Sequence, residues 1–111
     1  MELSEMKKEG AKIIALESVK AEMNRQQELW GFHDHPNGTS NDFITHSRHF
    51  RIACETAFEN GNGTWADILT EEFYEVLAEE DPERLKEELI QLAAVAVNWA
   101  SVIELKQCGE L

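Results

Sequence analysis

Several glutamates of this chain are spaced so that their side chains could form one metal-binding site. Glu72 and Glu75 are three residues apart, and Glu88 and Gln91 share that spacing further along the chain. Residues three apart lie on one face of a helix, so two antiparallel helices would bring all four side chains together. Three carboxylates and an amide oxygen form the oxygen-rich site that Mg²⁺ or Mn²⁺ prefers.

A solvated acidic face on each helix is the competing interpretation of the same residues. Ten of the 22 acidic residues lie between Asp67 and Glu88, and without a cation such charges would repel and raise one another's pKa. Gln91 and Asn98 lie on a stripe beside the apolar positions of their helix, so we expect both amides to be partly buried. Buried amides need hydrogen-bond partners, which favours a built site over a solvated face.

The elements that position these residues are predicted to be helices throughout. We expect one all-α domain over residues 1–111, in which helices span about 4–29, 43–59, 65–80 and 82–107. Ser4, Thr64 and Asp81 are the predicted N-caps. The last two helices are expected to form a tight antiparallel hairpin. Along the first helix an apolar stripe recurs at helical period, formed by Ile13, Leu16, Val19, Met23 and Trp30.

The composition argues against several classes of function. The chain has 22 acidic and 10 basic residues, and this net charge of −12 disfavours binding to nucleic acid or to a membrane surface. We expect no apolar run near the roughly 20 residues that span a bilayer, and no signal peptide. Two cysteines, Cys54 and Cys108, indicate reduced thiols in a cytoplasmic protein.

The stretch over residues 69–100 resembles the MazG-like all-α nucleoside triphosphate pyrophosphohydrolases, and the N-terminal part is similar to a phage and bacterial branch of them. That superfamily carries E-x-x-E, a spacer of a dozen or more residues, and E-x-x-D. Here twelve residues separate Glu75 from Glu88, and Gln91 stands where the family has Asp. Asn98 matches a further Asn of the family, and Glu71 matches the first of its paired glutamates.

The resemblance implies a MazG-like helical bundle that hydrolyses (d)NTPs to a monophosphate and pyrophosphate with Mg²⁺, or with Mn²⁺ as a substitute. It implies the metal ligands Glu72, Glu75, Glu88 and Gln91. A remaining carboxylate, Glu71 or Glu75, would orient or deprotonate the water. Asn98 would hydrogen-bond the sugar or a metal-bound water.

Gln91 leaves three outcomes open for such an enzyme. The number or affinity of the metal ions is lower, another acid such as Glu71 or Glu87 compensates, or hydrolysis is lost and an inactive nucleotide-binding relative remains. A fourth interpretation is a non-catalytic acidic module that mimics nucleic acid, although its support is the net charge alone. Stabilisation by a divalent cation separates a metal site from a mimic.

Two further groups of residues are candidates for substrate binding. Arg48 and Arg51 belong to a basic patch that would grip phosphates, or that forms an ordinary solvated face. Trp30, His33 and His35 would stack on and recognise a nucleobase, or they belong to a loop whose His caps a helix end.

The small apolar run over residues 92–97 indicates a helix packed on several sides. A single hairpin does not cover such a helix, so we expect a homodimer or homotetramer with sites near the interface.

Overall fold

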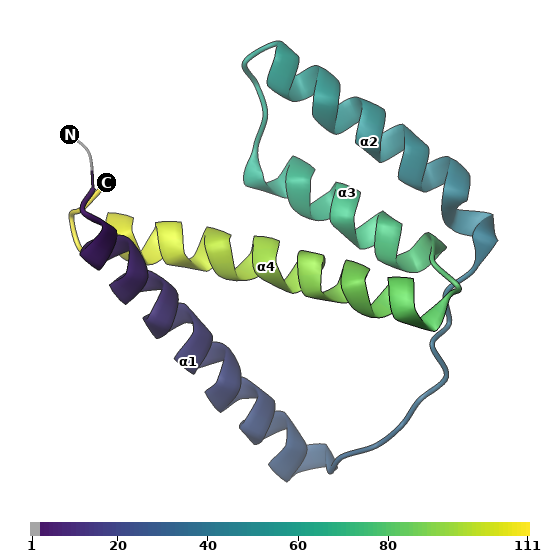
Figure 1. Ribbon diagram of the computed structural model, residues 1–111, viewed down its shortest axis with the longest axis horizontal. Helices are drawn as coiled ribbons and strands as arrows, with labels where there is room; N and C mark the ends of the chain where they lie inside the picture. Colours follow the sequence, from purple (N-terminus) through teal and green to yellow (C-terminus); the bar gives the residue numbers. More distant parts are fainter. Residues whose placement is uncertain (1–2) are drawn as a thin grey trace. The chain divides into compact units, whose positions relative to one another are not determined.

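The computed structural model describes residues 3–111, and within that range it contains four α-helices, one 3₁₀ turn and no strand (Figure 1). The all-α, four-helix prediction is therefore confirmed. The elements are α1 (Glu5–Trp30), the 3₁₀ turn η1 (Asn41–Phe43), α2 (Ile44–Glu59), α3 (Trp65–Ala78) and α4 (Pro82–Gln107).

The chain divides into two compact units, and α4 contributes to both. One unit contains α1 and the residues from Val97 onward, and the other contains Asn37–Ala96. The expectation of a single domain over residues 1–111 stays a prediction.

Local side-chain chemistry explains where the helices begin. Ser4 Oγ accepts a hydrogen bond from the backbone N–H of Lys7 at 3.2 Å. Thr64 and Asp67 form a reciprocal capping box at the start of α3. Asp81 Oδ2 accepts from the backbone N–H of Arg84 at 3.0 Å, which caps α4. All three predicted N-caps are confirmed.

The loop between α2 and α3 depends on one glycine. A Cβ atom on Gly63 would lie 2.3 Å from Cγ of Phe58, so the ring of Phe58 packs directly on the backbone there. Any larger residue would force this ring, which is 48% exposed, to move aside.

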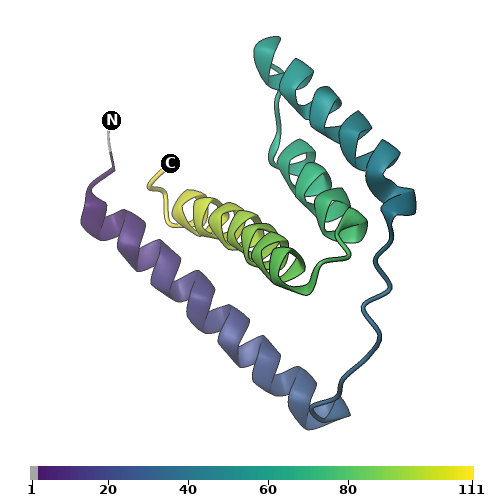
Figure 2. The ribbon, with the colours of Figure 1, turned by 45° about the vertical axis from the view of Figure 1, so that its right-hand side comes forward.

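The unit formed by Asn37–Ala96 is a helical meander. In both ribbon views α2 runs antiparallel to α3, and α3 runs antiparallel to the first half of α4 (Figures 1 and 2). Cys54, Val76 and Leu85 are its buried apolar residues. The rings of Phe50 on α2 and Tyr74 on α3 stack with their centroids 4.5 Å apart, and this contact stabilises the packing of the two helices.

The unit that contains α1 has a narrow interior. Its buried residues are Ala11 and Ala15 on α1, with Ser101 and Leu105 on α4. A salt bridge of 2.6 Å joins Lys7 to Glu110. The predicted apolar stripe of α1 lies outside this interior, with exposed fractions of 42% to 64%. Small residues therefore form the helix contact, and the large apolar side chains of the stripe remain uncovered.

α4 is long and apolar enough to cross a membrane, by length and composition only. The expectation that no apolar run approaches that length is therefore wrong for this helix. The interior helix of a soluble protein has the same composition, so the finding alone does not place the chain in a membrane.

Candidate metal centre

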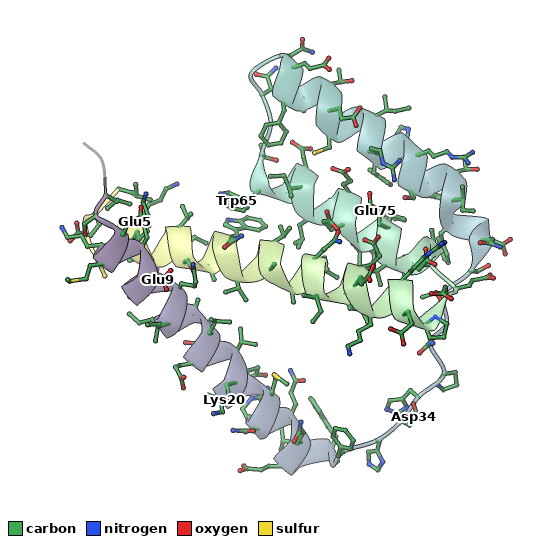
Figure 3. The ribbon with its side chains drawn as sticks, viewed as in Figure 1. Glu5, Glu9, Lys20, Asp34, Trp65 and Glu75 are labelled. Atoms are coloured by element: carbon green, nitrogen blue, oxygen red, sulfur yellow. The ribbon has the colours of Figure 1, made fainter. Side chains whose placement is uncertain are left out.

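Three glutamates from two helices meet in the unit formed by Asn37–Ala96. Glu72 and Glu75 lie on α3 and Glu88 lies on α4 (Figure 3 labels Glu75). Each offers one carboxylate oxygen, and these three oxygens all lie within 4.8 Å of one another. All three side chains are partly buried. The sequence-based prediction that these three residues converge is confirmed.

The turn between α3 and α4 sets this convergence. Glu75 lies six residues before Asp81 and Glu88 lies seven residues after it, so the two are nearly level when the helices fold back. The backbone at Glu79 is extended, which ends α3, and Pro82 occupies the first position of α4. Glu72 is one helical turn before Glu75 and shares its face.

The electrostatics of the cluster are unfavourable without a cation or a proton. Oε2 of Glu72 and Oε2 of Glu88 are buried and have no hydrogen-bond partner among the described residues. Burial, followed by the charge of Glu75, raises the pKa of Glu88 to about 7. Burial and the charges of Glu75 and Glu71 also raise the pKa of Glu72. Buried carboxylate oxygens need such a partner, so the cluster is suited to bind a cation.

A pocket of about 470 Å³ adjoins the cluster, and its wall carries both signs of charge. Its acidic residues are Glu75, Glu79, Glu80, Asp81 and Glu88, and its basic residues are Arg48, Arg51 and Arg84. Arg51 Nη2 lies 3.2 Å from Oε1 of Glu75.

Two of these arginines have no ion-pair partner, although acidic residues outnumber basic ones in the wall. The side chains of Arg48 and Arg84 form no hydrogen bond or ion pair with any residue from 3 to 111. They are therefore available to an anionic ligand. Arg84 was not among the predicted site residues, although its position four residues before Glu88 is the signal that places both side chains on one face of α4.

Glu71 has a different neighbour from the one expected. Burial first, and then its hydrogen bond with Glu71, raise the pKa of the Cys54 thiol to about 11. Glu71 therefore faces α2, and it is not among the carboxylates that converge. A thiol with such a high pKa is protonated at neutral pH, so Cys54 acts as a packed side chain and not as a nucleophile.

The expected burial of Gln91 and Asn98 is wrong, because both side chains are exposed. The more buried positions of the first part of α4 are Leu85, Glu88, Leu92 and Val95. Gln91 lies about 60° away from Glu88 around the helix, outside that stripe. Asn98 is ten residues beyond Glu88, or about 15 Å along the helix axis, and it belongs to the other unit.

The residues expected to recognise a base lie in the unit that contains α1. Trp30, His33 and His35 line one pocket of about 310 Å³ there, with the His rings 6.3 Å apart between centroids. Trp30 is 64% exposed, so its ring face is accessible. The structure brings these three residues together, and their role in recognising a base stays a prediction.

Comparisons of the chain with protein-family models, with curated proteins and with solved structures find no match.

Proposed function

We propose that the chain is a MazG-like, Mg²⁺-dependent nucleoside triphosphate pyrophosphohydrolase that acts in the cytoplasm. The observation that supports this most is that the carboxylate cluster lies next to a pocket lined by arginines. Partly buried carboxylates with two unpartnered oxygens adjoin a pocket that holds unpaired guanidinium groups. A ligand that suits both features carries several phosphates together with a divalent cation.

The residues present fit Mg²⁺, because all three ligand atoms are hard carboxylate oxygens within 4.8 Å of one another. Glu72, Glu75 and Glu88 would hold the ion. When bound, Mg²⁺ or Mn²⁺ would neutralise phosphate charge and polarise the phosphoryl group. The exposure of Gln91 removes it from this set in the proposal, so its difference from the family's Asp has little consequence for the three ligands.

The other residues would bind and orient the triphosphate. Arg48 and Arg84 would donate charge-assisted hydrogen bonds to the β- and γ-phosphates, which fixes the chain of phosphates in the pocket. Arg51 holds Glu75 at 3.2 Å and so limits the positions of that carboxylate.

A carboxylate of the cluster would act on the water. Glu75 is the residue that we assign to this role, since Glu71 faces Cys54. An oxygen of Glu75 would accept a proton from the water while the water oxygen bonds to the α-phosphorus. The bond from that phosphorus to the bridging oxygen breaks, and pyrophosphate leaves.

We also propose that the MazG-like bundle is completed by a second chain. The apolar run of α4 supports this, since Ala93, Ala94 and Ala96 are exposed. A homodimer or homotetramer would cover such a surface.

The test is pyrophosphate release from a panel of canonical and modified NTPs and dNTPs, in Mg²⁺, Mn²⁺ or EDTA. We expect metal-dependent release that EDTA abolishes. Thermal unfolding with and without Mg²⁺ accompanies it, and at 100 times the dissociation constant the metal should add about 2.7 kcal/mol to the free energy of unfolding.

The other outcomes identify the alternatives. Stabilisation by Mg²⁺ without any release would exclude the hydrolase and indicate a nucleotide-binding relative. No release and no stabilisation would exclude the metal site and favour the acidic binding module.

A further inference from the structure

Ser47, the fourth residue of α2, is a buried polar residue without a hydrogen-bond partner in the chain. It is 7% exposed, so more than nine-tenths of its surface is covered. Its hydroxyl forms no hydrogen bond with any residue from 3 to 111. Buried hydroxyls are normally hydrogen-bonded, so this one indicates a partner that binds from outside the chain.

Other hydroxyls within the helices of this chain are paired. Ser101 is 9% exposed, and its Oγ donates a hydrogen bond to the carbonyl of Val97 at 2.8 Å. Thr70 Oγ1 donates in the same way, at 2.7 Å, to the carbonyl four residues before it. This backward bond is the common one for a serine or threonine inside a helix. Ser47 does not form it, so its hydroxyl stays available to a ligand.

The hydroxyl of Ser47 has access to the pocket beside the carboxylate cluster. Ser47 lines this pocket of about 470 Å³ together with Ile44 and Ala78. Among the described residues, the fully enclosed side-chain oxygens without a partner are Oε2 of Glu72 and Oε2 of Glu88. Oγ of Ser47 is not one of them, so the small exposed part of this residue includes its oxygen. A molecule in the pocket can therefore contact the hydroxyl.

The unpaired groups of the pocket wall are donors of hydrogen bonds. The three acids at positions 79–81 each accept a hydrogen bond from a backbone N–H, at 3.3, 2.9 and 3.0 Å. These carboxylates therefore hold the local backbone. The guanidinium groups of Arg48 and Arg84 and the hydroxyl of Ser47 have no partner, and all of them can donate. A ligand that satisfies this wall offers several acceptor atoms.

The charge of the wall restricts the ligand further. Five acidic residues and three arginines line the pocket, so an anion without a cation would be repelled. Glu75 and Glu88 are the two of these acids that belong to the carboxylate cluster. An anion that binds together with Mg²⁺ avoids the repulsion, because the ion is then the largest positive charge of the site. Phosphate oxygens bind both Mg²⁺ and hydrogen-bond donors, so a polyphosphate fits the wall best.

We propose that Ser47 is a substrate-binding residue whose hydroxyl donates a hydrogen bond to a phosphate oxygen of a Mg²⁺-bound polyphosphate. This inference rests on the proposed function, since it takes the phosphate chain of the substrate as the ligand. It adds to that function a phosphate contact from the first part of α2, beside Arg48.

Isothermal titration of the full chain with pyrophosphate in Mg²⁺ measures this contact. Pyrophosphate is the proposed product, so the reaction does not consume it. Ser47→Ala should weaken its binding by about 10-fold or more, because a hydrogen bond to a charged group is lost. Ser101→Ala is the matched control. It removes the hydroxyl of another buried serine, in the other unit, and its affinity should equal that of the parent.

Denaturant unfolding in EDTA provides a second measurement, which a merely structural role would change. Ser47→Ala should not lower the unfolding midpoint, because the hydroxyl has no partner in the chain and alanine favours a helix more than serine does. A lower midpoint would show that the hydroxyl serves the fold, and it would overturn the proposal.

The remaining outcomes separate this proposal from the hydrolase. Equal affinity for pyrophosphate in Ser47→Ala and the parent would overturn the role of Ser47, as would equal weakening in Ser101→Ala. A parent chain that does not bind pyrophosphate in Mg²⁺ would overturn it too. Release from the NTP panel tests the hydrolase by itself, so metal-dependent release together with any of these results would leave the enzyme and remove Ser47 from its site.

Discussion

Two helices of this chain carry glutamate at the same spacing and use it in opposite ways. On α1, Glu22 lies three residues before Arg25, and its carboxylate accepts hydrogen bonds from the guanidinium group. On α3, Glu72 lies three residues before Glu75, another carboxylate. Helical geometry is identical in the two cases, so the spacing alone does not define a site.

The difference appears in the pKa values. Hydrogen bonds from Arg25 and Gln26 lower the pKa of Glu22 to about 2. Burial and the charges of neighbouring glutamates raise the pKa values of Glu72 and Glu88, the latter to about 7. A paired, exposed carboxylate has no need of a ligand, whereas a buried carboxylate among like charges gains from a proton or a cation.

The largest effect expected from this comparison is on catalysis. Glu75→Gln should lower Mg²⁺-dependent pyrophosphate release by about 100-fold or more, since loss of an outer-shell partner alone costs about 10–100-fold. Glu22→Gln is the matched control, and its release should equal that of the parent. Steady-state rates and far-ultraviolet circular dichroism of both variants would be compared. Full activity in Glu75→Gln would remove this residue from the site.

The second-largest effect is expected on the KM for the triphosphate, and it distinguishes the arginines of the pocket from Arg25 on α1. Arg84→Ala and Arg48→Ala should each raise the KM for the triphosphate by about 10-fold, because a hydrogen bond to a charged group contributes about 1.5–3 kcal/mol. Arg25→Ala removes a guanidinium group that is already paired with Glu22, so its KM should not change. Equal KM values in all three variants would indicate that the pocket does not bind phosphates.

A smaller effect concerns pH, and its sign differs between the two regions. The pKa of Glu88 is raised from 4.5 to about 7, so the folded state holds a proton that the unfolded state releases. Without metal, the free energy of unfolding should therefore fall as pH rises from about 4.5 to 7. The lowered pKa of Glu22 instead adds stability above pH 4.5, which is lost as pH falls towards 2.

Denaturant unfolding at pH 5 and pH 8 in EDTA would measure this. The free energy of unfolding should fall less between pH 5 and pH 8 in Glu88→Gln than in the parent chain. The difference should be on the order of 1 kcal/mol, the value for one buried, unsatisfied group. Glu22→Gln should leave the difference between pH 5 and pH 8 unchanged. The prediction would be contradicted if, at pH 8 in EDTA, the parent chain had a higher free energy of unfolding than Glu88→Gln.

The sequence predicted the starts of three helices correctly because each start has a side chain that caps it. Ser4, Thr64 and Asp81 each cap a helix at the predicted position. The end of α3 was predicted two residues too late, at Glu80. The extended backbone of Glu79 ends this helix at Ala78, because the reversal towards Pro82 begins there.

The site was predicted in part, because a motif fixes spacing but not the rotation of a helix against its neighbour. Glu72, Glu75 and Glu88 converge as the pattern predicted. The packing of α4 through Leu85 and Leu92 instead leaves Gln91 exposed, and this rotation follows from tertiary contacts that no local pattern encodes. The spacing of four residues between Arg84 and Glu88 is visible in the sequence, but only the packing of the helices shows that both residues line one pocket.

The smallest expected effect tests the rotation of α4 directly. Gln91→Asp restores the residue of the MazG-like motif, and in a site that used this position it would add a fourth carboxylate ligand. Because Gln91 is exposed, we expect the new charge to act through solvent and to raise Mg²⁺ affinity by only about two- to threefold, in line with a contribution below about 1 kcal/mol. Isothermal titration with Mg²⁺, beside Gln26→Asp as a control on α1, measures it. A gain of 100-fold would show that α4 turns Gln91 into the cluster when metal binds, and the three-glutamate site would then be incomplete.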